Sequence, residues 1–245
     1  MDKNVKSVLF YSISILVSLL VGVFNVYSQK KKVENLPGFD HKIIHFGFTL
    51  GVNSTDFILK HDLTQVDSLL SLEAQKQSGF NLGIVSDLHM TPLLNLRFIP
   101  ALSFAQRNLE YVFLNRKGER EFIMKPVEST FIEFPLDFKF RSERLNNIAA
   151  YMLGGFKYSI DLASQSHVDN SSNPPQDIVI KLKKNSYAYE LGAGMDFFLH
   201  YFKFATELKL SMGLNNVFIN DKTIFARPIE SLKSKILLIS FTFEG

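Results

Sequence analysis

Apolar and polar residues alternate one by one along much of the chain. In the segment IEFPLDFKFR, residues 132–141, an apolar residue stands at every second position from Ile132 to Phe140. Such a period of two is typical of a strand with one apolar and one polar face, because successive side chains point to opposite sides. The segment therefore predicts a strand. A protein core and a membrane would both accept its apolar face.

The same alternation recurs about eight times after residue 42, and it predicts an all-β protein. The predicted strands are HFGFTLGVN (45–53), GFNLGIVSDL (79–88), LNLRFIPALSF (94–104), IEFPLDFKFR (132–141), YMLGGFKYSID (151–161), YAYELGAGMDFFL (187–199), FKFATELKLSM (202–212) and ILLISFTFE (236–244).

The connections between these segments alternate between long and short along the chain. In an antiparallel sheet the long connections then share one end and the short turns share the other. An even strand count with this asymmetry is the layout of an outer-membrane β-barrel. The sequence predicts an eight-stranded antiparallel transmembrane β-barrel of outer-membrane type over residues 43–245.

The apolar faces are too bulky to fill the inside of such a barrel. Eight strands enclose a space that is only just wide enough to be filled by side chains. Several Phe, Tyr, Leu or Met from every strand exceed that space, whereas the opposite face is rich in Gly, Ala and Ser. A soluble cup of the lipocalin kind keeps its apolar face inside and is disfavoured. We expect Phe134, Phe138 and Phe140 to face lipid.

The polar faces carry balanced charges, which predict a salt-bridged plug. Buried charges must be paired or they cost several kcal/mol each, and a water-filled channel needs a wider barrel of roughly 16 strands. We expect Glu133, Asp137 and Lys139 to meet partners across the lumen. The predicted lumen cations are Arg97, Lys139, Arg141, Lys157, Lys203 and Lys209, and the anions are Glu133, Asp137, Asp161, Glu190, Asp196 and Glu207.

The amino-terminal segment has the features of an export signal. Two lysines precede an almost unbroken apolar run over residues 8–24, as in a signal peptide. An uncleaved anchor is the alternative, because about 20 apolar residues span a bilayer. The lysines at residues 30–32 oppose it, since they would lie on the translocated side. We predict a cleaved signal peptide at residues 1–28 and a periplasmic segment at residues 29–42.

Composition excludes several classes of function. The chain has 245 residues and no cysteine, so disulfide frameworks and thiolate metal sites are excluded. A formal net charge of +3 is too weak to indicate a nucleic-acid partner. No G-x-S-x-G, H-E-x-x-H or P-loop motif occurs. We predict no catalytic, metal-binding or cofactor-binding residues.

Two small groups of residues carry the remaining candidate chemistry. His41 and His45 could share a face of an extended segment, but no third ligand lies nearby, and we favour a structural role. Ser166, His167 and Asp169 lie together in a long connection and could supply a nucleophile and a base. The same residues are typical of a solvated loop, which is the interpretation we favour.

Two further features bear on partners. Pro100 and Pro135 fall in mid-strand, where proline removes a ladder donor. We favour a local bulge at each, and a weakened wall where another protein docks is the alternative. The segment Leu109 to Met124 predicts a projecting hairpin around Gly118, with aromatic residues and charges. It could contact a partner or pack on its own neighbouring loops.

Four segments resemble one known family: NLPGFDHKIIHFGFTLGVN, SDLHMTPLLNLRFIPALSFAQRNLEY, VESTFIEFPLDFKFRSERLNN and YMLGGFKYSIDLAS. They are similar to the PorT/SprT family of Bacteroidetes, over most of the chain that follows the predicted signal peptide. The resemblance implies a small outer-membrane barrel required for the type IX secretion system and, where present, for gliding motility. It implies outer-membrane lipid and other secretion subunits as partners, and it supplies no catalytic residue.

Two other functions remain open at this point. A barrel enzyme that modifies lipids, resembling the palmitoyltransferase PagP, would use a His, a Ser and an acid near the loop rim. A soluble periplasmic binding protein would keep its apolar faces inside. Neither interpretation agrees as well with the outward apolar faces and the absence of catalytic motifs.

Overall fold

The structure is a computed structural model that describes residues 34–170, 174 and 177–245. Residues Asn35–Gly245 form one compact unit. The predicted signal peptide, residues 1–28, lies outside the described residues, and so do residues 29–33 of the predicted periplasmic segment 29–42. No helix in the described part of the chain is long and apolar enough to cross a membrane.

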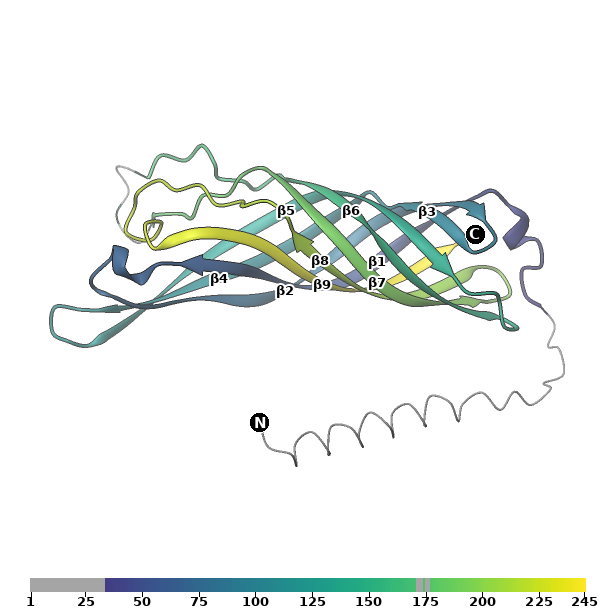
Figure 1. Cartoon of the computed structure of the whole chain (residues 1–245), viewed down its shortest axis with the longest axis horizontal. Coiled ribbons are helices and arrows are strands. Elements are labelled where there is room, and N and C mark those ends of the chain that lie inside the picture. Colours follow the sequence, from purple (N-terminus) through teal and green to yellow (C-terminus); the bar gives the residue numbers. More distant parts are fainter. Residues whose placement is uncertain (1–33, 171–173, 175–176) are drawn as a thin grey trace, which may run out of the picture. The chain divides into compact units, whose positions relative to one another are not determined.

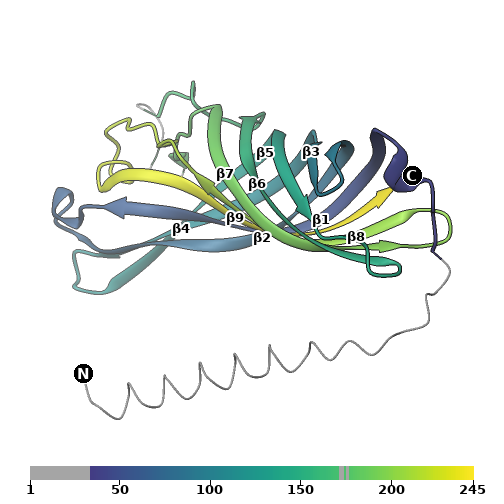
Figure 2. The same cartoon turned by 45° about the vertical axis from the view of Figure 1, so that its right-hand side comes forward.

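One closed antiparallel sheet makes up the body of the described chain (Figures 1 and 2). The sheet closes because β1 pairs with both β2 and β9. Two short 3-10 segments, η1 (Phe39–His41) and η2 (Leu63–Gln65), flank β1. The strands are β1 (Ile44–His61), β2 (Leu69–Thr91), β3 (Leu94–Phe98), β4 (Ala101–Leu114), β5 (Arg120–Arg141), β6 (Ile148–Asp161), β7 (Asn185–Phe198), β8 (Lys203–Gly213) and β9 (Ile229–Glu244).

The predicted eight-stranded barrel is confirmed, because β3 and β4 form one wall strand. Phe98 of β3 pairs with Leu136, and Ala101 of β4 pairs with Glu133, so the register against β5 continues unchanged across the interruption. The interruption falls at Pro100, whose ring nitrogen has no hydrogen to donate.

The predicted bulges at Pro100 and Pro135 are wrong. Pairing on both sides of Pro135 proceeds without a register shift. Each proline loses its own donor, but its carbonyl still accepts a ladder hydrogen bond: Ile84 N–H donates to Pro100 O at 3.0 Å, and Ile99 N–H donates to Pro135 O at 3.4 Å. One of the two ladder hydrogen bonds at each proline is therefore kept, and it holds the strands in register.

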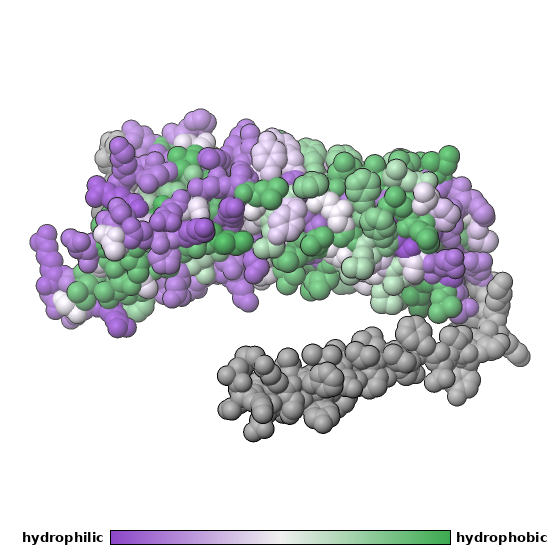
Figure 3. Space-filling model, in the orientation of Figure 1, coloured by the Kyte–Doolittle hydropathy of each residue, from purple (hydrophilic) through white to green (hydrophobic). Residues whose placement is uncertain are grey.

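The apolar faces point outward over the part of the barrel that carries the short turns. Phe138 and Phe140 are 45% and 60% exposed, Phe134 is partly covered, and the charged residues between them are buried. On the face shown in Figure 3, apolar residues gather over this part of the molecule. The inner face has little room: a Cβ on Gly155 would lie 2.2 Å from the carbonyl oxygen of Leu136. The predicted orientation of both faces is confirmed.

The opposite end of the barrel has an apolar interior. There β1, β2, β4, β5 and β9 extend beyond the lipid-facing band, and the described residues of the connections 162–184 and 214–228 pack against these extensions (Figures 1 and 2). Leu72, Leu109, Tyr111, Phe225 and Leu232 form the centre of a buried cluster. Residues 55–78 and 105–129, which lie in the long connections between the predicted strands, are mostly strand, and this corrects the sequence-based boundaries.

The predicted hairpin at Leu109 to Met124 is the outer end of β4 and β5. Its register runs unbroken from Leu109 opposite Lys125 to Leu114 opposite Arg120. Tyr111 and Phe113 are buried in the apolar cluster, whereas Phe122 is 65% exposed. One side of the hairpin therefore packs on its own loops, and the other side is open.

A substitution of Leu191 by arginine tests the placement of the lipid face. Leu191 is 57% exposed near the middle of β7. An arginine facing lipid near the bilayer midplane lowers the free energy of unfolding by about 2–4 kcal/mol, which urea unfolding in lipid vesicles measures. The matched variant Phe122→Arg lies beyond the lipid-facing band and changes it by less than about 0.5 kcal/mol. Equal losses in both variants would contradict the placement.

Candidate functional site

The most unusual feature of the molecule is the charged interior of the barrel. All twelve charged residues predicted to face the lumen are buried. The alternation also places Asp87 and Glu244 on the inner face, and both are at most 1% exposed. Arg107 and Lys125 are buried nearer the apolar end. In the described part of the chain, eight buried cations therefore face eight buried anions.

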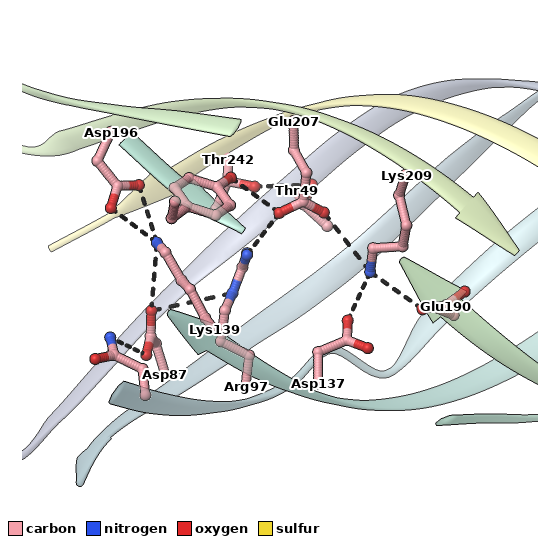
Figure 4. Close-up of polar contacts among 12 residues, drawn as sticks. Thr49, Asp87, Arg97, Asp137, Lys139, Glu190, Asp196, Glu207, Lys209 and Thr242 are labelled. Carbon is pink, nitrogen blue, oxygen red and sulfur yellow. Dashed lines mark hydrogen bonds and ion pairs between the residues drawn. The ribbon is translucent and has the colours of Figure 1, made fainter. Parts of the chain in front are cut away.

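Asp87 lies at the centre of the ion pairs near the short-turn end (Figure 4). Its Oδ2 is 3.9 Å from Lys139 Nζ, 3.8 Å from Lys203 Nζ and 4.0 Å from Arg97 Nε. Asn95 Nδ2 donates to the other carboxylate oxygen at 2.7 Å. Lys139 and Lys203 each have a closer partner, with Asp196 at 2.8 Å and Glu244 at 2.7 Å. These contacts join six strands across the lumen: β2, β3, β5, β7, β8 and β9.

A second group of ion pairs fills the middle of the lumen (Figure 4). Glu207 accepts hydrogen bonds from Arg97 Nη1 at 2.7 Å and from the Tyr151 hydroxyl at 2.9 Å. Lys209 Nζ lies 2.7 Å from Asp137, 3.2 Å from Glu190 and 3.6 Å from Glu207.

The chain of contacts continues toward the apolar end through Lys157. Its Nζ is 2.9 Å from Glu133 and 3.1 Å from Glu190. Arg107 is the last charged residue on this side. Its guanidinium carbon lies 4.3 Å from the ring centroid of Phe57 and 5.4 Å from that of Phe131, and the guanidinium donates hydrogen bonds to Ser129 and Ser234. The interior is thus polar where the outside meets lipid and apolar where the outside meets water.

The network leaves little free space in the lumen. The voids beside Glu190, Lys209 and Lys157 have volumes of about 30 Å³ and about 10 Å³, enough for very few water molecules. An open pore needs a continuous column of water, and these voids do not provide one. The ion-pair network therefore closes the lumen, because its charged side chains contact partners on other strands.

A short segment before β1 closes the short-turn end, and we call residues 35–41 the lid. Phe39 is stacked on buried His45, with ring centroids 3.6 Å apart. The Asn35 N–H donates to Asn147 Oδ1 and its side-chain nitrogen donates to Phe198 O, both at 2.9 Å. Arg144 also donates to the Asn35 carbonyl oxygen. The described part of the predicted segment 29–42 is therefore fixed to the barrel.

Asp40 holds the lid electrostatically. Its carboxylate lies 2.7 Å from Arg141 Nη1 and 3.6 Å from Arg144 Nη1. Burial alone would raise the pKa of Asp40, but the hydrogen bond and the charge of Arg141, with the charge of Arg144, hold its pKa below the ordinary value of 3.8.

Residues 27–219 match the family model described as outer membrane protein beta-barrel domain. The chain belongs to this family. We therefore refer to it as an outer-membrane β-barrel protein, and its location is the outer membrane. No curated protein matches the chain significantly.

Several solved structures are similar to this outer-membrane β-barrel protein. OprG from Pseudomonas aeruginosa has a TM-score of 0.40 at 15% identity, covering 82% of this chain and 94% of its own. Ail of Yersinia pestis, in complex with the heparin analogue sucrose octasulfate, has a TM-score of 0.35 at 11% identity, covering 83% and 100%. The N-terminal β-barrel domain of Pseudomonas aeruginosa OprF has a TM-score of 0.31 at 10% identity, covering 79% and 96%.

The candidate chemical residues differ in burial. His45 is buried under Phe39, whereas His41 is exposed in η1, so the two imidazoles do not share a face. His167 and Asp169 are exposed in the connection between β6 and β7. No cluster of three or more metal-ligating side chains occurs among the described residues.

Sequence reasoning missed four buried charges of this outer-membrane β-barrel protein. Asp87 and Glu244 continue the inner-face alternation of β2 and β9, and that alternation could have identified them. Arg107 and Lys125 could not be found in this way, because their segments were expected to lie outside the wall strands.

Replacing Glu207 with glutamine tests the energetic role of the network. The variant removes the negative charge that lies 2.7 Å from buried Arg97, and loss of one charge of a buried pair costs about 3–5 kcal/mol. Urea unfolding in vesicles measures this loss. Exposed Glu128 provides the control variant Glu128→Gln, for which we expect a change below about 0.5 kcal/mol. Wild-type stability in the Glu207 variant would show that the pairing is dispensable.

The low pKa of Asp40 predicts that docking of the lid depends on pH. A carboxylate whose pKa is lowered by folding stabilises the docked state above its unfolded pKa, and the effect is lost as pH falls through the folded value. At neutral pH, Asp40→Asn should therefore weaken amide hydrogen-exchange protection at Phe39 and Lys42 by about 1 kcal/mol. The difference from wild type should shrink as pH falls below 3.8 and disappear below the lowered pKa of Asp40. A difference that is independent of pH would refute the electrostatic account.

Proposed function

We propose that this protein is a non-enzymatic outer-membrane component that is required for assembly or operation of the type IX protein secretion system, and for gliding motility where that occurs. The observation that carries the proposal is the filled lumen. A barrel whose interior is held by ion pairs from Asp87 to Lys157 is suited to support other proteins and unsuited to conduct solutes.

The choice of machine rests on the sequence resemblance. The segments similar to the PorT/SprT family include SDLHMTPLLNLRFIPALSFAQRNLEY, which forms the end of β2, all of β3 and most of β4. Inner-face residues of this stretch, including Asp87 and Arg97, belong to the ion-pair network. The resemblance thus includes residues that fill the barrel as well as its lipid-facing surface.

The alternative function, a lipid-modifying barrel enzyme resembling PagP, has less support. Such an enzyme must admit an acyl chain, and the lumen voids of about 30 Å³ and about 10 Å³ are too small for one. The side chains of His167 and Asp169 are exposed to solvent, whereas a catalytic base must be held within hydrogen-bond reach of its nucleophile.

Contacts with other secretion subunits are part of the proposal. We place them on the open side of the hairpin Leu109 to Met124, which projects beyond the lipid-facing band. The wall at Pro100 and Pro135 is a second candidate, because two neighbouring ladder positions each lack a donor there.

Deletion of the gene tests the proposed function. Export of type IX cargo should be lost, while the amounts of unrelated outer-membrane proteins stay unchanged. Reintroduction of the wild-type gene should restore export, and so should the double variant Ser166→Ala/His167→Ala, because a scaffold does not need these side chains. Normal export in the deletion strain would refute the role, and failure of the double variant alone would favour the enzyme.

A further inference from the structure

The outer face of the hairpin carries apolar residues where no lipid covers them. Polar outward residues, Ser78 on β2 and Gln106 on β4, mark the end of the lipid-facing band. Beyond them the polarity of the strands inverts, with apolar residues inside and polar residues outside. Four outward residues break this rule and remain exposed in water: Leu70 (43%), Leu114 (43%), Phe122 (65%) and Met124 (51%).

Two of them, Leu70 and Phe122, line a recess with a volume of about 400 Å³ on the outer face of β2, β4 and β5. Its lining includes Leu70, Val112 and Phe122, together with Glu73, Glu110 and Arg120. Exposed apolar side chains rimmed by charged ones are typical of protein contact sites. We call this surface the hairpin recess.

Glu73 and Glu110 stand directly opposite each other in the recess. They are register partners in the β2–β4 pairing, and like charges at opposed positions destabilise a sheet. Gln75 donates a hydrogen bond to Glu110. In the described part of the chain, no ion pair to either carboxylate is formed. The sheet thus holds two negative charges together without a positive partner.

Arg120 does not neutralise this pair. It stands opposite Leu114, whereas Met124 stands opposite Glu110. The separation between Arg120 and Met124 along β5 corresponds to about 13 Å. Arg120 therefore lies at the far end of the recess, and the charge between Glu73 and Glu110 remains uncompensated.

This arrangement distinguishes between possible occupants. The phosphate-bearing headgroups of outer-membrane lipid are anionic, and two carboxylates repel them. A cationic side chain placed between Glu73 and Glu110 removes the like-charge repulsion, while apolar groups beside it cover Phe122 and Leu70. The negative charges and the apolar side chains beside them thus favour the same occupant, a polypeptide.

We propose that the hairpin recess binds a partner protein that inserts a lysine or arginine between Glu73 and Glu110 and covers Phe122 with an adjacent apolar side chain. The inference rests on the proposed function, in that the partner is another subunit of the same machine, and it specifies the chemistry of that contact.

The test uses the full-length protein in its own cells, with p-benzoylphenylalanine at position 122 as the photo-cross-linking probe. We expect a covalent adduct to one protein, and mass spectrometry should place the attachment next to a lysine or arginine of that protein. The double variant Glu73→Lys/Glu110→Lys should reduce the adduct at least tenfold, because two cations then oppose the incoming one. Glu73→Gln/Glu110→Gln should reduce it less.

The matched control is Glu128→Lys, which reverses an exposed carboxylate on β5 outside the recess and should leave the adduct unchanged. Heat-modifiable migration of each variant shows that its barrel is folded. An adduct to lipid alone, no adduct, or a yield that is unaffected by Glu73→Lys/Glu110→Lys would overturn the inference. If the adduct behaves as expected while the deletion strain exports type IX cargo normally, binding of a partner protein at the hairpin recess is supported and the proposed function is refuted.

Discussion

The structure depends on the pairing of charges inside a barrel that is too narrow to hold much water. Lys139, Lys203 and Lys209 are each at most 5% exposed, and each lies within 3.0 Å of a carboxylate. In such a space an unpaired charge would be more costly than almost any single packing defect. The partners come from different strands, so the network fixes the strands relative to one another. The apolar residues on the outside can then be chosen for lipid alone.

The alternation of polar and apolar residues was sufficient to predict the wall within the membrane. Strand geometry puts successive side chains on opposite faces, so Phe138 and Lys139 were assigned correctly without knowledge of their neighbours. The pattern failed beyond the membrane, because the outer face of the wall meets water there and the inner face packs on an apolar cluster. Leu109 and Tyr111 are inside and Glu110 is outside. Register shifts in β2, near Leu69 and Lys76, interrupt the period further.

Other features depend on three-dimensional pairing that no local pattern contains. The sequence could not show that the carbonyl groups of Pro100 and Pro135 keep their ladder bonds, and a bulge was the wrong expectation. It could not show that Phe39 reaches His45 to close one end. Nor could it show that Glu73 faces Glu110, since the two residues lie on different strands. The candidate docking site therefore became visible only in the folded sheet.

The two ends of the barrel have different roles. The lumen and the lid make a closed, rigid body in the membrane, and the extended strands carry the hairpin recess beyond it. The most direct test of the closed lumen is ion conductance of the purified protein in a planar lipid bilayer in concentrated potassium chloride. A lumen filled by ion pairs predicts no stable conductance steps above the background of the bare membrane. Reproducible, long-lived open levels from the folded wild-type barrel would contradict it.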